Sequence, residues 1–397
     1  MHVTHLSLTS VRSFRHLELD LTPGLHLVTG PNGSGKSNLM EAIALLATTR
    51  SARTTSDAEL IAWDALRDDP LPAARLGARV HTTIEDVLLE VIVSARTPAT
   101  PSDLVLPTAP NTATRRFRVN GIARRASDLI GRLRVVLFAA DDLAIIVGAP
   151  AARRRYLDIT ISQLDPSYVR ALQRYQRVLQ QRNSLLRRLQ ERRGQQHELD
   201  FWDEELAQTG AVLHTARAYA IGELGRGAAE RYTSLSTHAD SLQVCYRPAL
   251  PPALAEAVMQ PAAELAPLLL AAFVETRARD VQAGTTRVGP HRDDIEFLVG
   301  GHPAGATASR GELRGIALSL RLAEVALSTE RTGEPPVLLL DDVLSELDAE
   351  RRERVLAAAF AVDQVIITSP DPDRPGRAEL PSARRYAIAD GTLTPIA

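Results

Sequence analysis

Residues 30–37, GPNGSGKS, constrain this chain more than any other segment, because they match the pattern G-x-x-x-x-G-K-[ST]. The glycines Gly30, Gly33 and Gly35 allow the backbone to wrap closely around an anion, with N–H groups aimed at phosphate oxygens. A strand-like run, GLHLVT, precedes the motif, and a helix-forming run, NLMEAIALLAT, follows it. Strand, glycine-rich loop and helix is the context that a nucleotide-phosphate loop requires, so we predict one here.

The lysine and the serine that close the loop have distinct expected roles. We expect Lys36 to contact the β and γ phosphates of ATP, and Ser37 to bind Mg²⁺ through its hydroxyl. Lys36 is the only lysine in the chain, and it stands where a compact ammonium fits between phosphates better than a guanidinium does. The other residues expected to line the nucleotide are Gly30, Pro31, Asn32, Gly33, Ser34 and Gly35.

A segment with paired carboxylates, VLLLDD, ends 306 residues after Lys36, at Asp342. Its apolar residues predict a buried strand, from whose carboxyl end two aspartates emerge. We expect Asp341 to hold the Mg²⁺ ion and Asp342 to orient or deprotonate the attacking water, so Lys36 and Asp342 are the expected catalytic residues. The alternative is an aspartate pair that only caps a turn. The long separation requires an insertion between the two motifs.

The tetrapeptide SRGE, residues 309–312, opens a predicted helix over 308–327. A serine hydroxyl, a glycine N–H and a helix N-terminus together form an anion site. In isolation such a tetrapeptide is only a helix cap. Its order and spacing before VLLLDD indicate an ABC-type signature, in which Ser309 and Gly311 face the γ-phosphate held by another subunit.

The other segments predict an α/β core divided by a helical insert. Strand-like runs occupy 2–30, 281–299 and parts of 76–96, and Asn120-Gly121 is a hairpin turn signal. Two amphipathic helices within 165–233, the first capped by Asp165-Pro166, predict an antiparallel helical hairpin.

We therefore predict an α/β fold: an ABC-type ATPase head, with a mixed β-sheet and the phosphate loop, plus a helical second lobe. The predicted parts are 1–155, the N-terminal part of the ATPase lobe with an exposed loop insertion at 97–114; 156–285, the helical lobe with its hairpin arm; and 286–397, the C-terminal part of the ATPase lobe.

The net charge of −2 conceals an uneven distribution. Residues 114–193 carry 18 arginines against six acidic residues, a local charge of +12, so the remainder carries −14. This split favours a polyanion partner, and a solvated helix face is the alternative. There is no run of about 20 apolar residues, and the single cysteine, Cys245, fits a reducing cytoplasm. Cys245 is expected to be a buried, small apolar residue.

The sequences GPNGSGKSNLMEAI, SRGELR and LLLDDVLSELD resemble the SMC-type branch of ABC ATPases. Within it, PAARRRYLD, VGPHRDD and the length of 397 residues resemble the RecF family. The resemblance implies an ATP-dependent homodimer that binds single-stranded DNA and gapped or junction duplex, with RecR and RecO as partners. Such proteins help to load recombinase at single-strand gaps in DNA repair, recombination, replication and the SOS response.

The same resemblance implies that Asp348, in the D-loop Ser345–Asp348, lies at the dimer seam beside the nucleotide. The chain departs from the pattern at Arg310 and Glu312, where a glutamine is usual, and at Thr368 and Ser369, where many ABC ATPases have a histidine. No clear glutamine of a Q-loop stands before 139–142. We therefore expect a weak, DNA-dependent ATPase with slow hydrolysis.

Some sequence features leave two interpretations open. Arg153, Arg154 and Arg155 suit phosphate contacts or structural salt bridges, and His291 with Arg292 suits a packing network or a catalytic pair. The competing functions are a nucleotide-binding subunit of an ABC transporter, a long-armed chromosome-organising ATPase and a DNA nuclease with an ATPase head. Arms of about 30 residues are too short for the second, and we find no second carboxylate cluster for the third.

Overall fold

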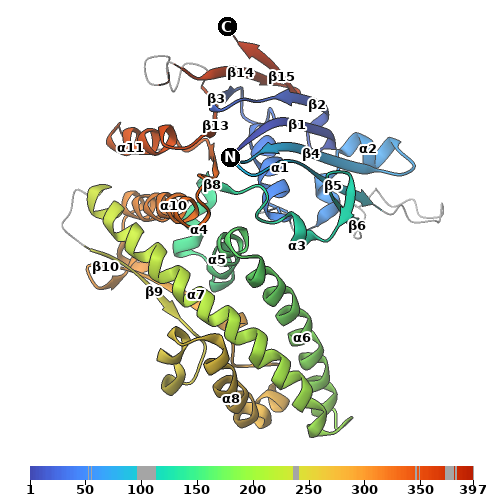
Figure 1. Cartoon of the computed structure of the whole chain (residues 1–397), viewed down its shortest axis with the longest axis vertical. Coiled ribbons are helices and arrows are strands. Elements are labelled where there is room, and N and C mark those ends of the chain that lie inside the picture. The colour runs from blue at the N-terminus through green and yellow to red at the C-terminus, as the bar shows by residue number, and fades with distance from the viewer. Residues whose placement is uncertain are drawn as a thin grey trace. The chain divides into compact units, whose positions relative to one another are not determined.

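The structure is a computed structural model, and it forms two compact units (Figure 1). Unit 1 comprises Met1–Asp141 and Glu324–Ala397, and unit 2 comprises Asp142–Ala323. The predicted lobe boundaries at 155/156 and 285/286 differ from these divisions and stay a prediction. The described residues are 1–51, 53–54, 56–95, 113–235, 241–344, 347, 349–371, 380 and 382–396. The predicted insertion at 97–114 lies outside them except for Ala113 and Thr114, which begin a strand.

The first sheet of unit 1 is antiparallel throughout. Along β5 every second residue is buried, as expected for a sheet with one face on the core. The predicted hairpin at Asn120 and Gly121 is confirmed, since both have positive φ, 52° and 76°. The strand order is β2 (Phe14–Asp20), β1 (His2–Val11), β4 (Ala73–His81), β5 (Asp86–Ala95), β6 (Ala113–Val119) and β7 (Ile122–Arg124).

The second sheet of unit 1 is mixed, as predicted, because only β15 runs antiparallel to its neighbour. Its interior strand β12 carries Leu338, Leu339 and Leu340, all fully buried, as a parallel strand covered on both faces requires. The strand order is β15 (Thr392–Ile396), β14 (Arg384–Ala389), β3 (Gly24–Thr29), β13 (Gln364–Ser369), β12 (Val337–Asp341) and β8 (Val135–Ala139).

Helix α1 (Lys36–Thr48) contacts strands of both sheets of unit 1, β4 and β5 in one and β8, β12 and β13 in the other. Its buried side chains, among them Met40 and Ile43, join both sheets in one hydrophobic core. The phosphate loop is therefore fixed between β3 and a helix that is anchored along most of its length. The remaining helices of this unit are α2 (Trp63–Asp68), α3 (Ala126–Leu129), α11 (Ala349–Phe360) and the 3₁₀ turn at Asp57–Leu60, and a further 3₁₀ turn, Ala140–Asp142, ends in unit 2.

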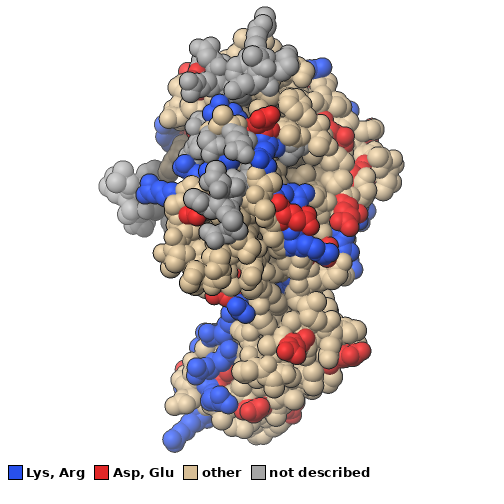
Figure 2. Space-filling view, turned by 90° about the vertical axis from the view of Figure 1, so that its left-hand side faces the viewer, with Lys and Arg blue, Asp and Glu red and all other residues tan. Residues whose placement is uncertain are grey.

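Unit 2 contains the predicted helical hairpin. Helix α6 (Pro166–Gln190) begins as predicted: Asp165 accepts a 2.7 Å hydrogen bond from the N–H of Ser167, and Pro166 is the first helical residue. A turn containing Gly194, with φ 111°, leads into α7 (Leu199–Leu235), which packs along α6 (Figure 1). On the part of unit 2 that Figure 2 shows, basic side chains gather along one edge and acidic ones lie apart from them.

A third long helix of unit 2, α8 (Ala262–Ala283), packs against both arms of the hairpin. It overturns part of the strand prediction for 281–299, because residues 281–283 end α8 and only β10 (Asp294–Val299) is a strand. The other helices and strands of this unit are α4 (Leu143–Val147), α5 (Pro150–Leu164), β9 (Leu242–Arg247), β11 (His302–Pro303), α9 (Ala304–Thr307) and α10 (Arg310–Thr332), which continues into unit 1. Short 3₁₀ turns lie at Gln196–Glu198, Pro252–Leu254, Glu256–Met259 and Pro290–Arg292, and β9, β10 and β11 form one small sheet.

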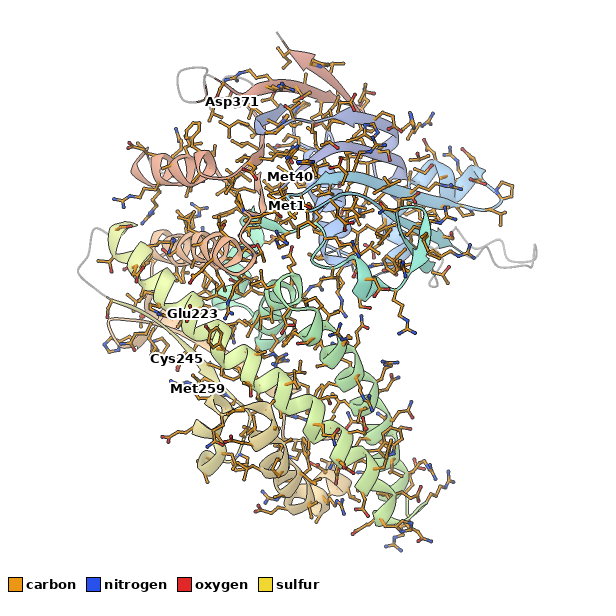
Figure 3. The ribbon with its side chains drawn as sticks, in the orientation of Figure 1. Met1, Met40, Glu223, Cys245, Met259 and Asp371 are labelled. Atoms are coloured by element: carbon orange, nitrogen blue, oxygen red, sulfur yellow. The ribbon has the colours of Figure 1, made fainter. Side chains whose placement is uncertain are left out.

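Cys245 lies on β9 and is only half-buried, so the expectation of a buried cysteine was wrong (Figure 3). Its strand is at the edge of the small sheet, in the order β11, β10, β9, and it packs on α7. From Gln243 to Arg247 every side chain of this edge strand is partly or fully exposed, which the apolar character of the run LQVCY does not show.

Candidate nucleotide-binding site

The loop 30–37 connects the buried strand β3 to α1, as the sequence predicted. Gly33 and Gly35 have φ values of 83° and 111°, which other residues rarely adopt. Gly35 is the N-cap of α1, so the first N–H groups of the helix, which lack intrahelical acceptors, point out of its N-terminus. The side-chain oxygen of Ser34 is buried and has no hydrogen-bond partner among the described residues. These features fit a bound polyphosphate, which supplies acceptors for the orphaned donors.

Lys36 lies at the first position of α1 and is 6% exposed. Its Nζ donates hydrogen bonds to the carbonyl oxygens of Gly30, at 2.7 Å, and Pro31, at 3.0 Å. Burial lowers the pKa of the ammonium group, while the carboxylates of Asp342 and Asp341 act in the opposite direction. The ammonium group of Lys36 therefore lies beside the N–H groups of the loop. All of these groups attract an anion bound in the loop.

The structure brings the two predicted motifs of unit 1 together. Ser37 Oγ donates to Asp341 Oδ1 at 3.1 Å, although the two residues lie 304 positions apart. This contact follows from the sheet order, because β13 alone separates β3, which leads into the loop, from β12, which ends at Asp341. A hydroxyl and a carboxylate side by side are the oxygen ligands that Mg²⁺ prefers.

Thr368, at the end of β13, holds both aspartates. Its hydroxyl donates to Asp341 Oδ1 at 2.8 Å and accepts from the N–H of Asp342 at 3.0 Å. Asp342 has φ 55°, an uncommon conformation for a residue other than glycine. Sequence reasoning noted Thr368 only as a position without the usual histidine and missed this role. No local signal marked this role, because it depends on β13 lying beside the aspartate strand β12 in the sheet.

The signature segment lies in unit 2, where its serine caps α10. Ser309 Oγ accepts from the N–H of Glu312 at 3.3 Å, and Glu312 Oε2 accepts from the N–H of Ser309 at 2.7 Å. This reciprocal pair is a capping box, so Glu312 has a structural role at the start of α10. Ser309 is exposed and Gly311 half-buried in the chain by itself. Of the predicted D-loop, Ser345, Glu346 and Asp348 lie outside the described residues.

Two arginines of the α5 triplet, Arg153 and Arg154, bond to the acidic pair Asp293-Asp294. Arg153 is 9% exposed and bonds Asp294 twice, through Nε at 2.5 Å and Nη2 at 3.0 Å. Arg154 donates to the backbone oxygen of Asp293 at 2.7 Å. The segments PAARRRYLD, at 150–158, and VGPHRDD, at 288–294, therefore form one structural network, and the salt-bridge alternative holds for Arg153.

The aspartate in this network, Asp293, is buried together with its partners. Burial opposes ionisation, but hydrogen bonds from His214 and Tyr246 and the charge of Arg217 hold its pKa below the usual range. His291 Nε2 donates to the backbone oxygen of Thr286 at 3.0 Å, and its Nδ1 accepts from the Tyr175 hydroxyl at 2.7 Å. Burial lowers the pKa of His291 to about 4, so the ring is neutral near pH 7 and suits a packing role.

The described residues contain no cluster of three or more His, Cys, Asp or Glu side chains that could hold a metal ion. Nor does any described helix combine the length and apolar character needed to cross a membrane.

The family model described as the RecF/RecN/SMC N terminal domain matches residues 2–379. The DNA replication and repair protein RecF of Chloroflexus aurantiacus is 46% identical over 99% of this chain and 99% of its own length. The protein of the same name from Roseiflexus castenholzii is 43% identical over the full length of both chains.

Solved structures extend the similarity to the fold. A structure of the recombination mediator protein RecF with ATP, described as part of the RecFOR pathway, superposes with a TM-score of 0.84. It is 28% identical and covers 100% of this chain and 98% of its own. An Smc head bound to a winged-helix domain of ScpA superposes with a TM-score of 0.52 at 15% identity, which supports the ATPase-head fold alone.

Proposed function

The chain belongs to the RecF/RecN/SMC family, and on that premise we propose that it is an ATP-operated DNA-binding protein of recombinational repair. The observation that carries the proposal is the contact of Ser37 with Asp341 at the mouth of the phosphate loop. The relatives named above are DNA replication and repair proteins, and they match this chain from end to end. No transporter subunit is among them.

In the proposed site, ATP binds with its phosphates in the loop 30–37 and Lys36 contacts the β and γ phosphates. Ser37 and Asp341 hold Mg²⁺, which neutralises charge on the phosphate oxygens when it is bound. Asp342 orients or deprotonates water at the γ-phosphate. Hydrolysis is slow, because Thr368, which a hydrogen bond ties to Asp341, occupies the position of the usual histidine.

The second half of the proposed site comes from another copy of the chain. Ser309 is exposed at the N-terminus of α10, where its hydroxyl and the helix dipole suit the γ-phosphate of a partner's nucleotide. Asp348 is proposed to lie at the same seam. ATP then closes a homodimer on DNA and hydrolysis releases it. The proposed DNA substrates are single-stranded DNA and gapped or junction duplex, and RecR and RecO are the proposed protein partners, in the cytoplasm.

Sedimentation and DNA binding of the wild type and of Lys36→Arg test this function. We expect the wild type to change from monomer to dimer with ATP and Mg²⁺ and to bind DNA more tightly in that state. Lys36→Arg keeps the charge but replaces the compact ammonium, so we expect it to stay monomeric. Arg226→Lys, an exchange in the opposite direction at an exposed site, is the control. A wild type without an ATP-dependent mass increase and without affinity for DNA would refute the proposal.

A further inference from the structure

Helix α6 has an exposed face that carries positive charge alone. Among its 25 residues there is no aspartate or glutamate, and five of its six arginines are exposed. Arg170, Arg174, Arg177 and Arg188 follow at intervals of 4, 3 and 11 residues, which return to one side of a helix. We define the α6 basic face by the exposed arginines of this helix: Arg170, Arg174, Arg177, Arg187 and Arg188.

Ion pairing within the chain leaves part of this face unneutralised. Arg174 pairs with Glu205 of α7 at 2.6 Å, and Arg188 lies 4.0 Å from Glu198, at the limit of an ion pair. In contrast, Arg170, Arg177 and Arg187 form no ion pair with any residue that the structure describes. A solvated surface helix usually mixes both signs of charge, so three unpaired arginines on an acid-free helix favour an external anion.

A second basic segment, 284–292, lies directly against α6. Its Thr286 donates through N and Oγ1 to Asn183 Oδ1, at 2.8 and 2.7 Å. Two glycines permit the close approach: a Cβ on Gly284 would lie 3.3 Å from Arg187 Cγ, and one on Gly289 would lie 2.7 Å from the Tyr175 hydroxyl. The segment adds two exposed arginines, Arg287 and Arg292, to the arginines of α6.

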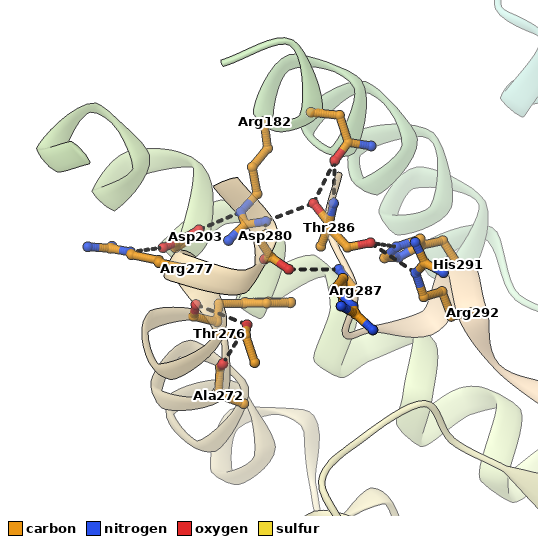
Figure 4. A network of polar contacts seen from close by, with 12 residues as sticks. Arg182, Asp203, Ala272, Thr276, Arg277, Asp280, Thr286, Arg287, His291 and Arg292 are labelled. Carbon is orange, nitrogen blue, oxygen red and sulfur yellow. Dashed lines mark hydrogen bonds and ion pairs between the residues drawn. The ribbon is translucent and has the colours of Figure 1, made fainter. Parts of the chain in front are cut away.

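A buried ion network fixes these two segments to each other (Figure 4). Arg182 of α6 is fully buried and pairs with Asp203 of α7 at 2.6 Å and with Asp280 of α8 at 2.8 Å. Its Nη1 also donates to Thr286 Oγ1 at 2.8 Å, and Asp280 accepts from the N–H of Arg287 at 3.1 Å. Arg182 therefore holds the 284–292 segment in place against α6. The positive charges of α6 and of this segment are preorganised as a result.

We propose that the α6 basic face and the 284–292 segment together hold the phosphate backbone of duplex DNA. The proposal rests on the DNA-binding function proposed above and identifies its contact surface. Arginine and the interleaved Gln173, Gln180 and Ser184 are residue types that donate hydrogen bonds to phosphate without selecting a sequence. Both aromatic residues of α6, Tyr168 and Tyr175, are buried, so this helix offers no platform for stacking the bases of a single strand.

The dimensions of the helix suit this ligand. From Arg170 to Arg188 the helix advances about 27 Å at 1.5 Å per residue, close to the roughly 34 Å of one turn of B-form DNA. A row of charges of that length spans several phosphates of one backbone. Binding should therefore depend strongly on salt concentration, because each neutralised phosphate releases a counterion.

The test uses the full chain with ATP and Mg²⁺ and a mixed-sequence duplex, titrated over a range of salt concentrations. In the triple variant Arg170→Gln, Arg177→Gln, Arg187→Gln we expect about tenfold weaker binding or more, and a salt slope less steep by about 2 to 3. The matched control, Arg67→Gln, Arg226→Gln, Arg247→Gln, removes the same charge from other exposed positions and should bind as the wild type does. Unchanged melting temperature and ATP-dependent dimerisation show that both variants remain folded.

The outcomes separate this proposal from the one on which it rests. A triple variant with the affinity and salt slope of the wild type would overturn the assigned surface and leave the DNA-binding function standing. Equal losses in both triple variants would also overturn it, since charge alone would then explain the loss. A loss for single-stranded DNA that equals the loss for duplex would refute the duplex assignment. If the wild type binds no DNA, the proposed function fails, and the surface fails with it.

Discussion

At the scale of single residues, one hydroxyl links three segments of the candidate site. Thr368 donates to Asp341 and accepts from the N–H of Asp342, so both of its hydrogen-bonding capacities are used. Asp341 Oδ1 in turn accepts from Ser37. The carboxylate proposed to hold Mg²⁺ is therefore fixed by the strand that lies between it and the phosphate loop. A ligand that is held before the metal arrives loses less conformational entropy on binding.

Replacing Thr368 with valine keeps the shape of the side chain and removes the hydroxyl. We expect the free energy of unfolding to fall by about 1 to 3 kcal/mol, because the N–H of Asp342 loses its acceptor. We also expect weaker binding of Mg²⁺ with ATP, because Asp341 loses a donor that orients it. Urea unfolding measures the first effect, and titration with a fluorescent ATP analogue at varied Mg²⁺ measures the second.

The matched control for this exchange is Thr394→Val, on the exposed strand β15 of the same sheet. It should change neither quantity by a measurable amount. An unchanged Mg²⁺ dependence in Thr368→Val would show that Asp341 needs no support from β13.

The geometry of the phosphate loop was predictable from sequence because its residues are contiguous. Thr368 was not, because its role depends on the order of strands β3, β13 and β12 in the sheet. A threonine at the end of an apolar run has no local signal for function. Its significance appears only when two other strands, from distant parts of the chain, lie on either side of it.

At the scale of elements, local signals placed the beginning of α6 and the hairpin turn at Asn120-Gly121 correctly. Capping and turn chemistry act within four residues, so a short window of sequence contains them. The strand expected over 281–299 was wrong in its first part for the opposite reason. Thr285, Thr286 and Val288 have high β propensity, but Asn183 and Arg182 of another helix satisfy the hydrogen bonds of Thr286.

The close approach of the 284–292 segment to α6 gives a prediction at this scale. Gly289 has φ 117°, and a Cβ there would lie 2.7 Å from the Tyr175 hydroxyl. We expect Gly289→Ala to lower the free energy of unfolding by about 2 to 4 kcal/mol, because backbone strain and a clash with a buried side chain add. Chemical denaturation followed by circular dichroism measures the change.

A second glycine isolates the contribution of the backbone. Gly301 has φ 81° and no atom within 4 Å of an added Cβ, so Gly301→Ala should cost only the conformational strain, about 1 kcal/mol. Equal losses in the two variants would show that the 284–292 segment moves away from α6 at little cost. That result would also remove the rigid support proposed for the basic surface.

At the scale of the whole molecule, the two halves of the proposed nucleotide site belong to different units. Lys36, Ser37 and Asp341 are in unit 1, and Ser309 is in unit 2. The sequence predicted both halves separately, because each is a short motif. The pairing of the two halves across two copies of the chain was predicted only from the family resemblance. No pattern within one chain encodes a contact between two chains.

The exchange Ser309→Arg tests that pairing. We expect the variant to bind ATP with the affinity of the wild type, because unit 1 supplies the loop, but to remain monomeric in sedimentation with ATP and Mg²⁺. A bulky side chain at an exposed helix N-terminus would occupy the space proposed for the partner's γ-phosphate. The exchange also removes a capping box, which lowers the free energy of unfolding by about 0.5 to 2 kcal/mol. The effect of losing the cap must therefore be separated from the effect of losing the dimer contact.

Ser56→Arg provides that separation, because Ser56 forms the capping box of the 3₁₀ turn at 57–60 in unit 1. It should lose comparable stability and still form the ATP-dependent dimer. If Ser309→Arg dimerises as well, Ser309 is a helix cap and nothing more, and the ATP-closed dimer needs another explanation. If both variants fail to dimerise although both bind ATP, general destabilisation is the cause. Only a dimer lost in Ser309→Arg and kept in Ser56→Arg assigns the second half of the site to α10.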